Sequence, residues 1–298
     1  MNVRIAKNSG FCFGVKRAIK IAMNAAENDK NTVTLGPIIH NPQMVQKLKN
    51  QGIISVDSLE EVKGRRVIIR SHGIEEDKKR KLLEKSAEVI DATCPYVSKT
   101  QQHGAQLYNE GYKVIIFGDE NHPEVVALKS YVPNNQALVI SNETELENFH
   151  FNKVGVISQT TRKLSGLQKV VEKLLEISAE VRVINTICNA TSVRQEATAK
   201  LAKASELMIV IGGKNSSNTK MLARICNEHI KTFHIETSDE IRKEWFDDIK
   251  ENLGITAGAS TPDWIIVEVY NKILEYIGDE EKQIEKFDDI PIFKEDKC

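Results

Sequence analysis

The sequence lacks any long hydrophobic run. Its longest aliphatic stretches, such as residues 208–211, are far shorter than the roughly 20 residues of a helix that crosses a bilayer. The N-terminal residues also lack the apolar segment of a secretory signal peptide. We therefore expect a cytoplasmic protein with no membrane partner.

An excess of positive charge is absent as well. The 298 residues include 41 Lys and Arg and 42 Asp and Glu, for a net charge of −1. Nucleic-acid-binding proteins usually carry a basic excess, so we expect no nucleic-acid partner. The hydrophobic fraction of 41% is sufficient for ordinary buried cores, and the length suggests two or three domains.

Cysteine is scarce, and no two cysteines have the C-x-x-C spacing of a zinc ribbon. Five thiols in a chain of this length do not make a disulfide framework. Cys226 shares a predicted helical face with Leu222 and Ile225, which indicates a core position. Cys298 ends a polar segment and is expected to be a free, uninvolved thiol. The other three cysteines remain candidates for metal binding, catalysis or burial.

Those three cysteines are regularly spaced. Each precedes a glycine by 24 residues, in the pairs Cys12 and Gly36, Cys94 and Gly118, and Cys188 and Gly212. Equal spacing predicts three copies of one supersecondary unit, each with a thiol at the same structural place. If the units meet around an axis, the thiols form a metal or cluster site with one open position, because fully ligated clusters take four cysteines. The alternative is three buried cysteines that never meet, and the equal spacing favours the shared site.

Short β-rich runs alternate with longer amphipathic segments. We predict strands at 32–35, 67–70, 113–117, 154–157, 207–211 and 255–257, and helices at 78–85, 96–109, 164–177, 193–205 and 264–277. This alternation predicts an α/β fold with mostly parallel sheets and helices on both faces. Ligands bind such sheets outside the carboxyl ends of the strands.

The repeat sets the expected domain boundaries, near residues 94 and 186. We expect a first unit at 1–94, a second at 95–186 with Cys94 at its start, and a third at 187–278. The charged segment 279–298 is expected to form a C-terminal arm or a loosely held tail.

Polar loops follow two predicted strands of every unit. They contain mainly hydroxyl, amide and imidazole side chains, at His40, His72, His122, Glu124, Thr160, Thr161, Ser216, Ser217, Asn218, Ser260 and Thr261. Taken singly, a Ser, Thr or Asn before a helix is explained as an N-cap worth about 1 kcal/mol. Several helix N-termini with hydroxyls and imidazoles would instead form a cradle for phosphate oxygens. Three histidines on equivalent loops favour the anion site.

Two kinds of loop residue could carry chemistry. Each of the three cysteines precedes a predicted helix, whose positive end favours the thiolate that binds iron–sulfur clusters. Glu124 lies two residues after His122 at a helix start. Its carboxylate could simply favour the helix dipole. Beside an open metal position it would deliver a proton to a leaving hydroxyl.

Seven motifs in order carry a family resemblance. They are Gly10-Phe-Cys-Phe-Gly-Val-Lys-Arg-Ala, His40-Asn-Pro, Arg70-Ser-His-Gly, Asp91-Ala-Thr-Cys-Pro, Asn121-His-Pro-Glu, Ser158-Gln-Thr-Thr and Ser216-Ser-Asn-Thr. The set, from residue 10 to about residue 265, resembles the 4-hydroxy-3-methylbut-2-enyl diphosphate reductases of the methylerythritol phosphate route to isoprenoids. The resemblance implies three α/β domains in a pseudo-threefold trefoil around a central 4Fe–4S cluster. Its ligands would be Cys12, Cys94 and Cys188, with one iron left open.

The resemblance also implies the roles of the loop residues. The diphosphate would be bound by His40, His72, His122, Ser216, Asn218 and Ser260, with Ser217 and Thr160 or Thr161 completing the pocket. Glu124 would be the proton donor. The implied reaction removes the allylic hydroxyl of the substrate and gives isopentenyl diphosphate and dimethylallyl diphosphate. A flavodoxin or ferredoxin would supply the electrons.

Other functions remain open at this point. An iron–sulfur sensor or electron carrier would need no substrate cradle. A cluster enzyme similar to quinolinate synthase would act on substrates without a diphosphate. A zinc-stabilised scaffold would need no catalytic acid. The imidazole and hydroxyl loops favour the reductase over an enzyme similar to quinolinate synthase, and metal and sulfide analysis would separate the zinc scaffold from the rest.

Overall fold

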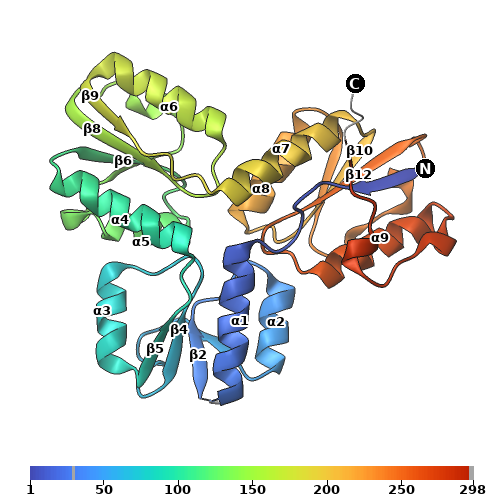
Figure 1. The fold of residues 1–298 in the computed structure, drawn as a ribbon, viewed down its shortest axis with the longest axis horizontal. Helices are drawn as coiled ribbons and strands as arrows, with labels where there is room; N and C mark the ends of the chain where they lie inside the picture. The colour runs from blue at the N-terminus through green and yellow to red at the C-terminus, as the bar shows by residue number, and fades with distance from the viewer. Residues whose placement is uncertain (29–30, 295–298) are drawn as a thin grey trace. The chain divides into compact units, whose positions relative to one another are not determined.

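The computed structural model describes residues 1–28 and 31–294, in which helices and strands alternate along the chain (Figure 1). Within these residues, twelve strands form three four-stranded sheets with the orders β3-β2-β4-β5, β7-β6-β8-β9 and β1-β12-β10-β11. Every strand pairing is parallel. The predicted α/β class with parallel sheets is confirmed. No helix in the described parts of the chain is both long and apolar enough to span a membrane.

The first sheet is covered by helices on both faces (Figure 1). On one face, Val67 and Ile69 pack with Leu82 of α3. Thr32 on the neighbouring strand donates through its hydroxyl to the carbonyl of Ala25 in α1, at 3.4 Å. The elements are β2 (Thr32–Leu35), β3 (Ile54–Val56), β4 (Arg66–Ile69), β5 (Glu88–Asp91), α1 (Phe13–Asn28), α2 (Pro42–Asn50) and α3 (Glu76–Lys85).

The second sheet has the same arrangement. Ile115 and Phe117 pack with the leucines of α6, whereas Val114 and Ile116 pack with residues of α4 and α5. This alternation along one strand makes it apolar on both faces. The elements are β6 (Lys113–Phe117), β7 (Leu138–Ile140), β8 (Phe151–Ser158), β9 (Ser178–Val183), α4 (Pro95–Asn109), α5 (Pro123–Ser130) and α6 (Leu164–Ile177).

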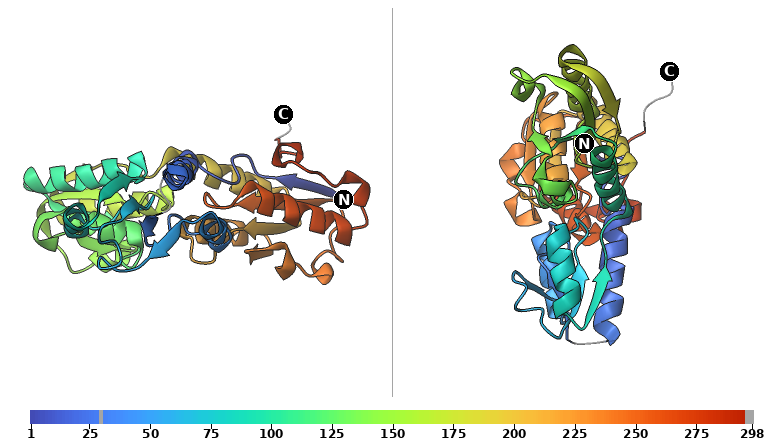
Figure 2. Two further views of the ribbon diagram at one scale, coloured as in Figure 1. Left: turned by 90° about the horizontal axis from the view of Figure 1, so that it is seen from below. Right: turned by 90° about the vertical axis from the view of Figure 1, so that its left-hand side faces the viewer.

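The third sheet repeats the pattern once more, as the two further views show (Figure 2). Ile209 and Ile211 face α9, and Met208 and Val210 face α7 and α8. The elements are β1 (Asn2–Ile5), β10 (Leu207–Ile211), β11 (Thr232–Ile235), β12 (Asn252–Ala257), α7 (Asn189–Lys203), α8 (Ser217–Asn227) and α9 (Asp263–Tyr276). Short 3-10 helices lie at Pro133–Asn135, Glu143–Leu146, Ser238–Glu240, Lys243–Trp245, Glu280–Lys282 and Phe287–Asp289.

The first strand of the chain belongs to the third sheet. β1 pairs with β12, from Asn2 opposite Asn252 to Ile5 opposite Ile255. This differs from the expected grouping of residues 1–94, because one sequence carries no signal for pairing between such distant segments. At the edge of its sheet, β1 takes the place that β5 and β9 take in theirs. Each of these edge strands leads into a cysteine and then into a long helix.

The equal cysteine-to-glycine spacing has a structural cause. The helices that follow the cysteines have 16, 15 and 15 residues, and the next strands have 4, 5 and 5. The glycine follows the strand, and its N–H donates to the last residue of the outer strand beside it. These bonds are Gly36 to Val56 at 2.8 Å, Gly118 to Ile140 at 2.8 Å and Gly212 to Ile235 at 2.9 Å. The repeat therefore extends to individual hydrogen bonds.

The chain divides into two compact units. The smaller unit contains Met1–Cys12, His40–Pro42 and the residues from Asn189 onward. The larger unit contains Phe13–Ile39 and Gln43–Cys188, and so holds the first two sheets.

The C-terminal arm is not loose where the structure describes it. Ile292 forms a parallel bridge with Ile5. The N–H of Ile5 donates to Pro291 and the N–H of Phe293 donates to Ile5, both at 2.9 Å. Ile290 is buried in the core of the third sheet. Residues 295–298 lie outside the described residues, and the prediction for Cys298 with them.

Candidate active site

The three predicted cluster ligands occupy equivalent places. Each is half-buried and directly precedes a long helix. Each donates its backbone N–H to a carbonyl in the loop after an inner strand: Cys12 to Ala259 at 3.1 Å, Cys94 to Ser71 at 2.9 Å and Cys188 to Thr160 at 3.0 Å. The same hydrogen bond thus holds each cysteine beside a polar loop of its sheet.

The donor set fits an iron–sulfur cluster in its chemistry. Thiols are the ligands that such clusters take, and a helix N-terminus favours an anionic ligand. Cys94 and Cys188 lie in the larger unit and Cys12 in the smaller one. Across residues 1–28 and 31–294, no three His, Cys, Asp or Glu side chains are grouped closely enough to hold a metal ion. The shared cluster site therefore stays a prediction.

Glu124 is buried at the start of α5 and is held by Thr160. Glu124 is only 2% exposed to solvent. The N–H of Thr160 donates to Oε1 at 2.7 Å, and the hydroxyl of Thr160 donates to Oε2 at 2.8 Å. Because Thr160 also accepts the N–H of Cys188 through its carbonyl, one residue connects the acid to a predicted cluster ligand.

The protonation of Glu124 follows from this environment. Burial raises the pKa of its carboxyl above the ordinary value, and the two hydrogen bonds from Thr160 partly oppose the shift. A carboxyl with a raised pKa keeps its proton at a higher pH. Such a group is suited to donate a proton in a reaction.

His72 and His122 lie together in the larger unit. Their ring centroids are 5.9 Å apart and the rings meet edge to face at 77°. His122 is the N-cap of α5, and its Nδ1 accepts the N–H of Glu124 at 3.2 Å. Because Nδ1 is an acceptor, the proton of the neutral ring is on Nε2. His122 can therefore present an N–H donor.

A second polar group lies in the smaller unit, at the start of α8. Ser216 is the N-cap and accepts the N–H of Thr219 at 3.4 Å. Asn218 is buried, yet neither Oδ1 nor Nδ2 has a hydrogen-bond partner among the described residues. Since buried amides are normally hydrogen-bonded, both atoms are available to a polar ligand. Ser260 donates to the carbonyl of His40 at 3.1 Å, which brings the His40 loop into this unit.

The predicted residues that remain are Thr161, Ser217 and Thr261. Thr161 accepts a hydrogen bond from Nε2 of Gln159 at 3.0 Å, whereas Thr160 contacts Glu124. Ser217 is the half-buried first residue of α8. Thr261 is buried and donates to Ile211 at 3.0 Å, as a structural residue would.

Two arginines near the cysteines, Arg194 and Arg17, were not predicted from the sequence as site residues. Arg194 of α7 is 3% exposed and donates to the carbonyls of Asn8 and Gly10, at 2.7 and 2.8 Å. Arg17 of α1 donates to the carbonyl of Thr93 at 3.1 Å. Arg194 thus holds the segment before Cys12, and Arg17 holds the residue before Cys94. Arg17 lies within the first motif, but nothing in a single sequence distinguishes it from a surface arginine.

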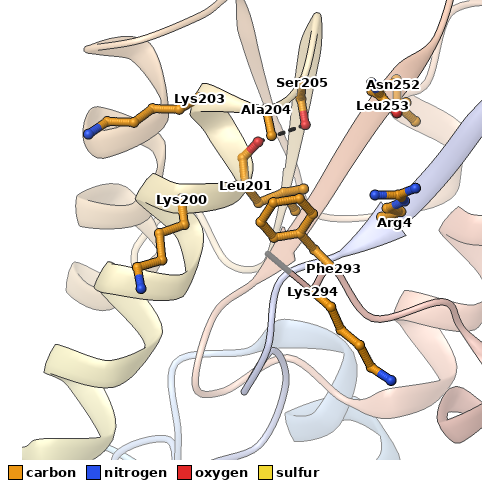
Figure 3. Close-up of a pocket in the computed structure, with 10 residues that line it drawn as sticks. All are labelled: Arg4, Lys200, Leu201, Lys203, Ala204, Ser205, Asn252, Leu253, Phe293 and Lys294. Carbon is orange, nitrogen blue, oxygen red and sulfur yellow. Dashed lines mark hydrogen bonds between the residues drawn. The ribbon is translucent and has the colours of Figure 1, made fainter. Parts of the chain in front are cut away.

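A cavity of about 660 Å³ lies elsewhere in the smaller unit (Figure 3). It is formed by the last residues of α7, the first and last strands of the sheet and the C-terminal segment. Its charged lining residues are Arg4, Lys200, Lys203 and Lys294. No predicted site residue lines this cavity, so it is not part of the candidate site.

Comparison with known proteins agrees with the motifs. The model of the family described as LytB protein matches residues 3–274. The 4-hydroxy-3-methylbut-2-enyl diphosphate reductase of Geobacter sp. (strain M21) is 47% identical over 276 residues, covering 92% of this chain and 97% of the relative. The enzyme of the same name from Nautilia profundicola is 45% identical over 279 residues, covering 92% and 99%.

Solved structures are similar as well. One, described as (E)-4-hydroxy-3-methyl-but-2-enyl diphosphate reductase, the terminal enzyme of the non-mevalonate pathway, has a TM-score of 0.67 and 45% identity over 92% of this chain and all of that one. The E-1-hydroxy-2-methyl-but-2-enyl-4-diphosphate reductase of Plasmodium falciparum has a TM-score of 0.84 and 25% identity over 98% of this chain and 91% of that one. The resemblance inferred from the motifs is confirmed. The chain belongs to the LytB protein family.

Proposed function

We propose that the protein is a reductase of 4-hydroxy-3-methylbut-2-enyl diphosphate. It removes the allylic hydroxyl and yields isopentenyl diphosphate and dimethylallyl diphosphate. Relatives of that name match nearly the whole chain. The observation that carries the proposal is the buried carboxyl of Glu124, which Thr160 holds by both oxygens and links to Cys188.

Cys12, Cys94 and Cys188 are the proposed ligands of a 4Fe–4S cluster with one iron free of a protein ligand. When bound, such a cluster supplies electrons and a Lewis acid for the substrate oxygen. Their equivalent places and shared hydrogen-bond pattern support the assignment. Cys226 is unsuited, because burial raises the pKa of its thiol to about 12.

In this proposal the diphosphate is bound by loop residues with imidazole, hydroxyl and amide side chains. They are His40, His72, His122, Thr160, Ser216, Ser217, Asn218 and Ser260. The amide of Asn218, buried and unpaired among the described residues, supports a polar ligand at the start of α8. A helix N-terminus adds its own N–H groups to such an anion site.

Glu124 supplies a proton. Replacing the hydroxyl by hydrogen consumes two electrons and two protons and releases one water. Burial raises the pKa of the Glu124 carboxyl, so the carboxyl keeps its proton to a higher pH than an exposed glutamate and is suited to donate it. Thr160 fixes the direction of the carboxyl, and His122 contacts the backbone of the same residue. The two electrons come from a flavodoxin or a ferredoxin.

The test is anaerobic purification, iron and sulfide analysis, and turnover with a chemical reductant. We expect about four iron atoms and four sulfides per chain. Cys94→Ser should lose most of both and all turnover. Cys226→Ala is the matched control, because it changes a thiol that lies in a core, and it should keep the cluster. A Cys94→Ser protein with full iron and sulfide would refute the ligand assignment.

A further inference from the structure

Helices α1 and α4 begin beside Cys12 and Cys94, and one side chain connects their starts. Arg17 of α1 donates through Nη1 to the carbonyl of Thr93, the residue before Cys94. Both helices and this contact belong to the larger unit. The starts of the two helices are therefore linked by one arginine side chain.

Two large aromatic side chains are exposed on these turns. Phe13, next to Cys12, is 64% exposed, and Tyr96, two residues after Cys94, is 47% exposed. Single exposed apolar residues are ordinary on protein surfaces. Two aromatics beside two proposed cluster ligands are different, because aromatic residues are enriched in protein–protein contacts.

The charged residues that α1 and α4 themselves carry near these aromatics are all basic. Exposed lysines at positions 16 and 20 of α1 and 99 of α4 lie within two turns of the aromatics on the same helices. α4 contains no acidic residue, and the only acid of α1 is Glu27 at its far end. The chain as a whole carries one more acid than base. First turns of helices usually favour acids, so their absence from both turns leaves the surface basic.

We infer that the surface formed by Phe13, Lys16, Lys20, Tyr96 and Lys99 docks a small acidic electron-carrier protein. The inference rests on the proposed function, which requires electrons from outside the chain. Two reduced carriers each give up one electron. The substrate takes both electrons with two protons, its C–O bond breaks, and water leaves. A carrier docked on this surface contacts Phe13, which follows Cys12, and Tyr96, which lies two residues after Cys94.

Charge complementarity identifies the carrier as acidic. Complementary charges steer encounter and raise the association rate, and the effect weakens as salt screens them. The two aromatics supply the apolar centre that slows dissociation. A basic peptide would be repelled by this surface, and a nucleic acid would supply no electrons.

A second basic surface, the cavity of Figure 3, is the internal comparison. Its lysines 200 and 203 lie at the end of α7 that is far from Cys188, which precedes the first residue of that helix. Lys200 is already paired with Glu196 at 3.2 Å. This surface therefore lacks the short route to a cluster ligand.

The experiment uses the loaded full-length enzyme and two reductants. The variant Lys16→Glu/Lys20→Glu/Lys99→Glu is assayed with reduced flavodoxin or ferredoxin and with dithionite-reduced methyl viologen. We expect the KM for the protein carrier to rise about tenfold or more and to lose its dependence on salt. Turnover with viologen and the iron content should stay at the wild-type level. Phe13→Ser/Tyr96→Ser should raise the same KM without changing its salt dependence.

Two controls each reverse the charge of two lysines elsewhere. Lys49→Glu/Lys81→Glu alters exposed lysines of α2 and α3, and Lys200→Glu/Lys203→Glu alters the cavity. Both should keep the wild-type KM. An unchanged KM in the triple variant, or a rise confined to the cavity variant, would overturn the docking surface while viologen turnover upholds the reductase. Absence of viologen turnover in the loaded wild type would overturn the reductase itself.

Discussion

Two opposing influences decide the protonation of Glu124. Burial disfavours the carboxylate, and the two donors of Thr160 favour it. Burial is the larger influence, so the pKa is raised. Between the ordinary carboxyl pKa of about 4.3 and this raised value, the folded protein binds more protons than the unfolded chain. Glu124 therefore lowers the free energy of unfolding as the pH rises through that range.

Glu124→Gln removes the acidic proton but keeps the size and position of the side chain. The amide keeps the shape of the side chain but cannot supply the proton, so turnover should fall by about 100-fold or more. The melting temperature of the variant should gain on that of the wild type as the pH rises above about 4.3. Rate measurements with viologen and thermal unfolding over a pH series test both parts. A near-normal rate would remove Glu124 from the proton path.

Thr160→Val and Thr161→Val form a matched pair. The hydroxyl of Thr160 donates to Glu124, whereas that of Thr161 accepts from Gln159. Loss of the Thr160 hydroxyl therefore removes one of the interactions that lower the pKa of the Glu124 carboxyl. The pH profile of Thr160→Val should move to higher pH, while that of Thr161→Val stays in place. The profile of turnover against pH is the measurement, and equal profiles for the two variants would contradict the assignment. The sequence could not choose between these neighbours, because adjacency along a loop does not tell which side chain points at the acid.

At the scale of elements, inner strands were predictable and edge strands were not. β2, β6 and β10 have the predicted bounds, because helices cover both of their faces and all their residues except Lys113 are buried. β3, β5 and β9 are short or half-exposed, and β5 and β9 mix charged and apolar residues. A half-exposed edge leaves no apolar run to detect, so the pairing partners stayed hidden until the sheets were seen.

Gly155 sets how closely α4 approaches β8. A Cβ at this position would lie 2.7 Å from Cδ2 of Leu107. Gly155→Ala should therefore lower the free energy of unfolding by about 1–3 kcal/mol through overpacking. Leu107→Ala alone should cost about 2–5 kcal/mol. The double variant should lose less than the sum, as urea unfolding in a double-mutant cycle would show, and strict additivity would contradict the contact.

At the scale of the whole molecule, the repeat was visible in the sequence and its closure was not. Equal spacing of cysteines and glycines arises from helices and strands of almost equal length. The closure joins β1 to β12 and the C-terminal segment to β1. For the candidate site, the loop residues could be predicted from the family resemblance of the motifs. The contacts of Thr160, Arg17 and Arg194 became known only from the structure.

Removal of the C-terminal segment tests its role in the smaller unit. A chain ending at Lys286 loses the bridge to Ile5 and the buried side chain of Ile290. We expect a lower melting temperature and aggregation, because the edge of β1 becomes available to other chains. A chain ending at Lys294 keeps the pairing and is the control. Equal melting curves and equal light scattering of the two chains would show that the segment does not protect this edge.

The place of β1 also determines an order of assembly on the ribosome. β1 is made first, but its partner β12 is made about 250 residues later. By then the residues of the larger unit, with Cys94 and Cys188, have already been synthesised. Cys12 gains its hydrogen bond to Ala259 only after that residue exists. A cofactor that needs all three thiols must therefore wait for the nearly finished chain, and an incomplete nascent chain cannot trap it.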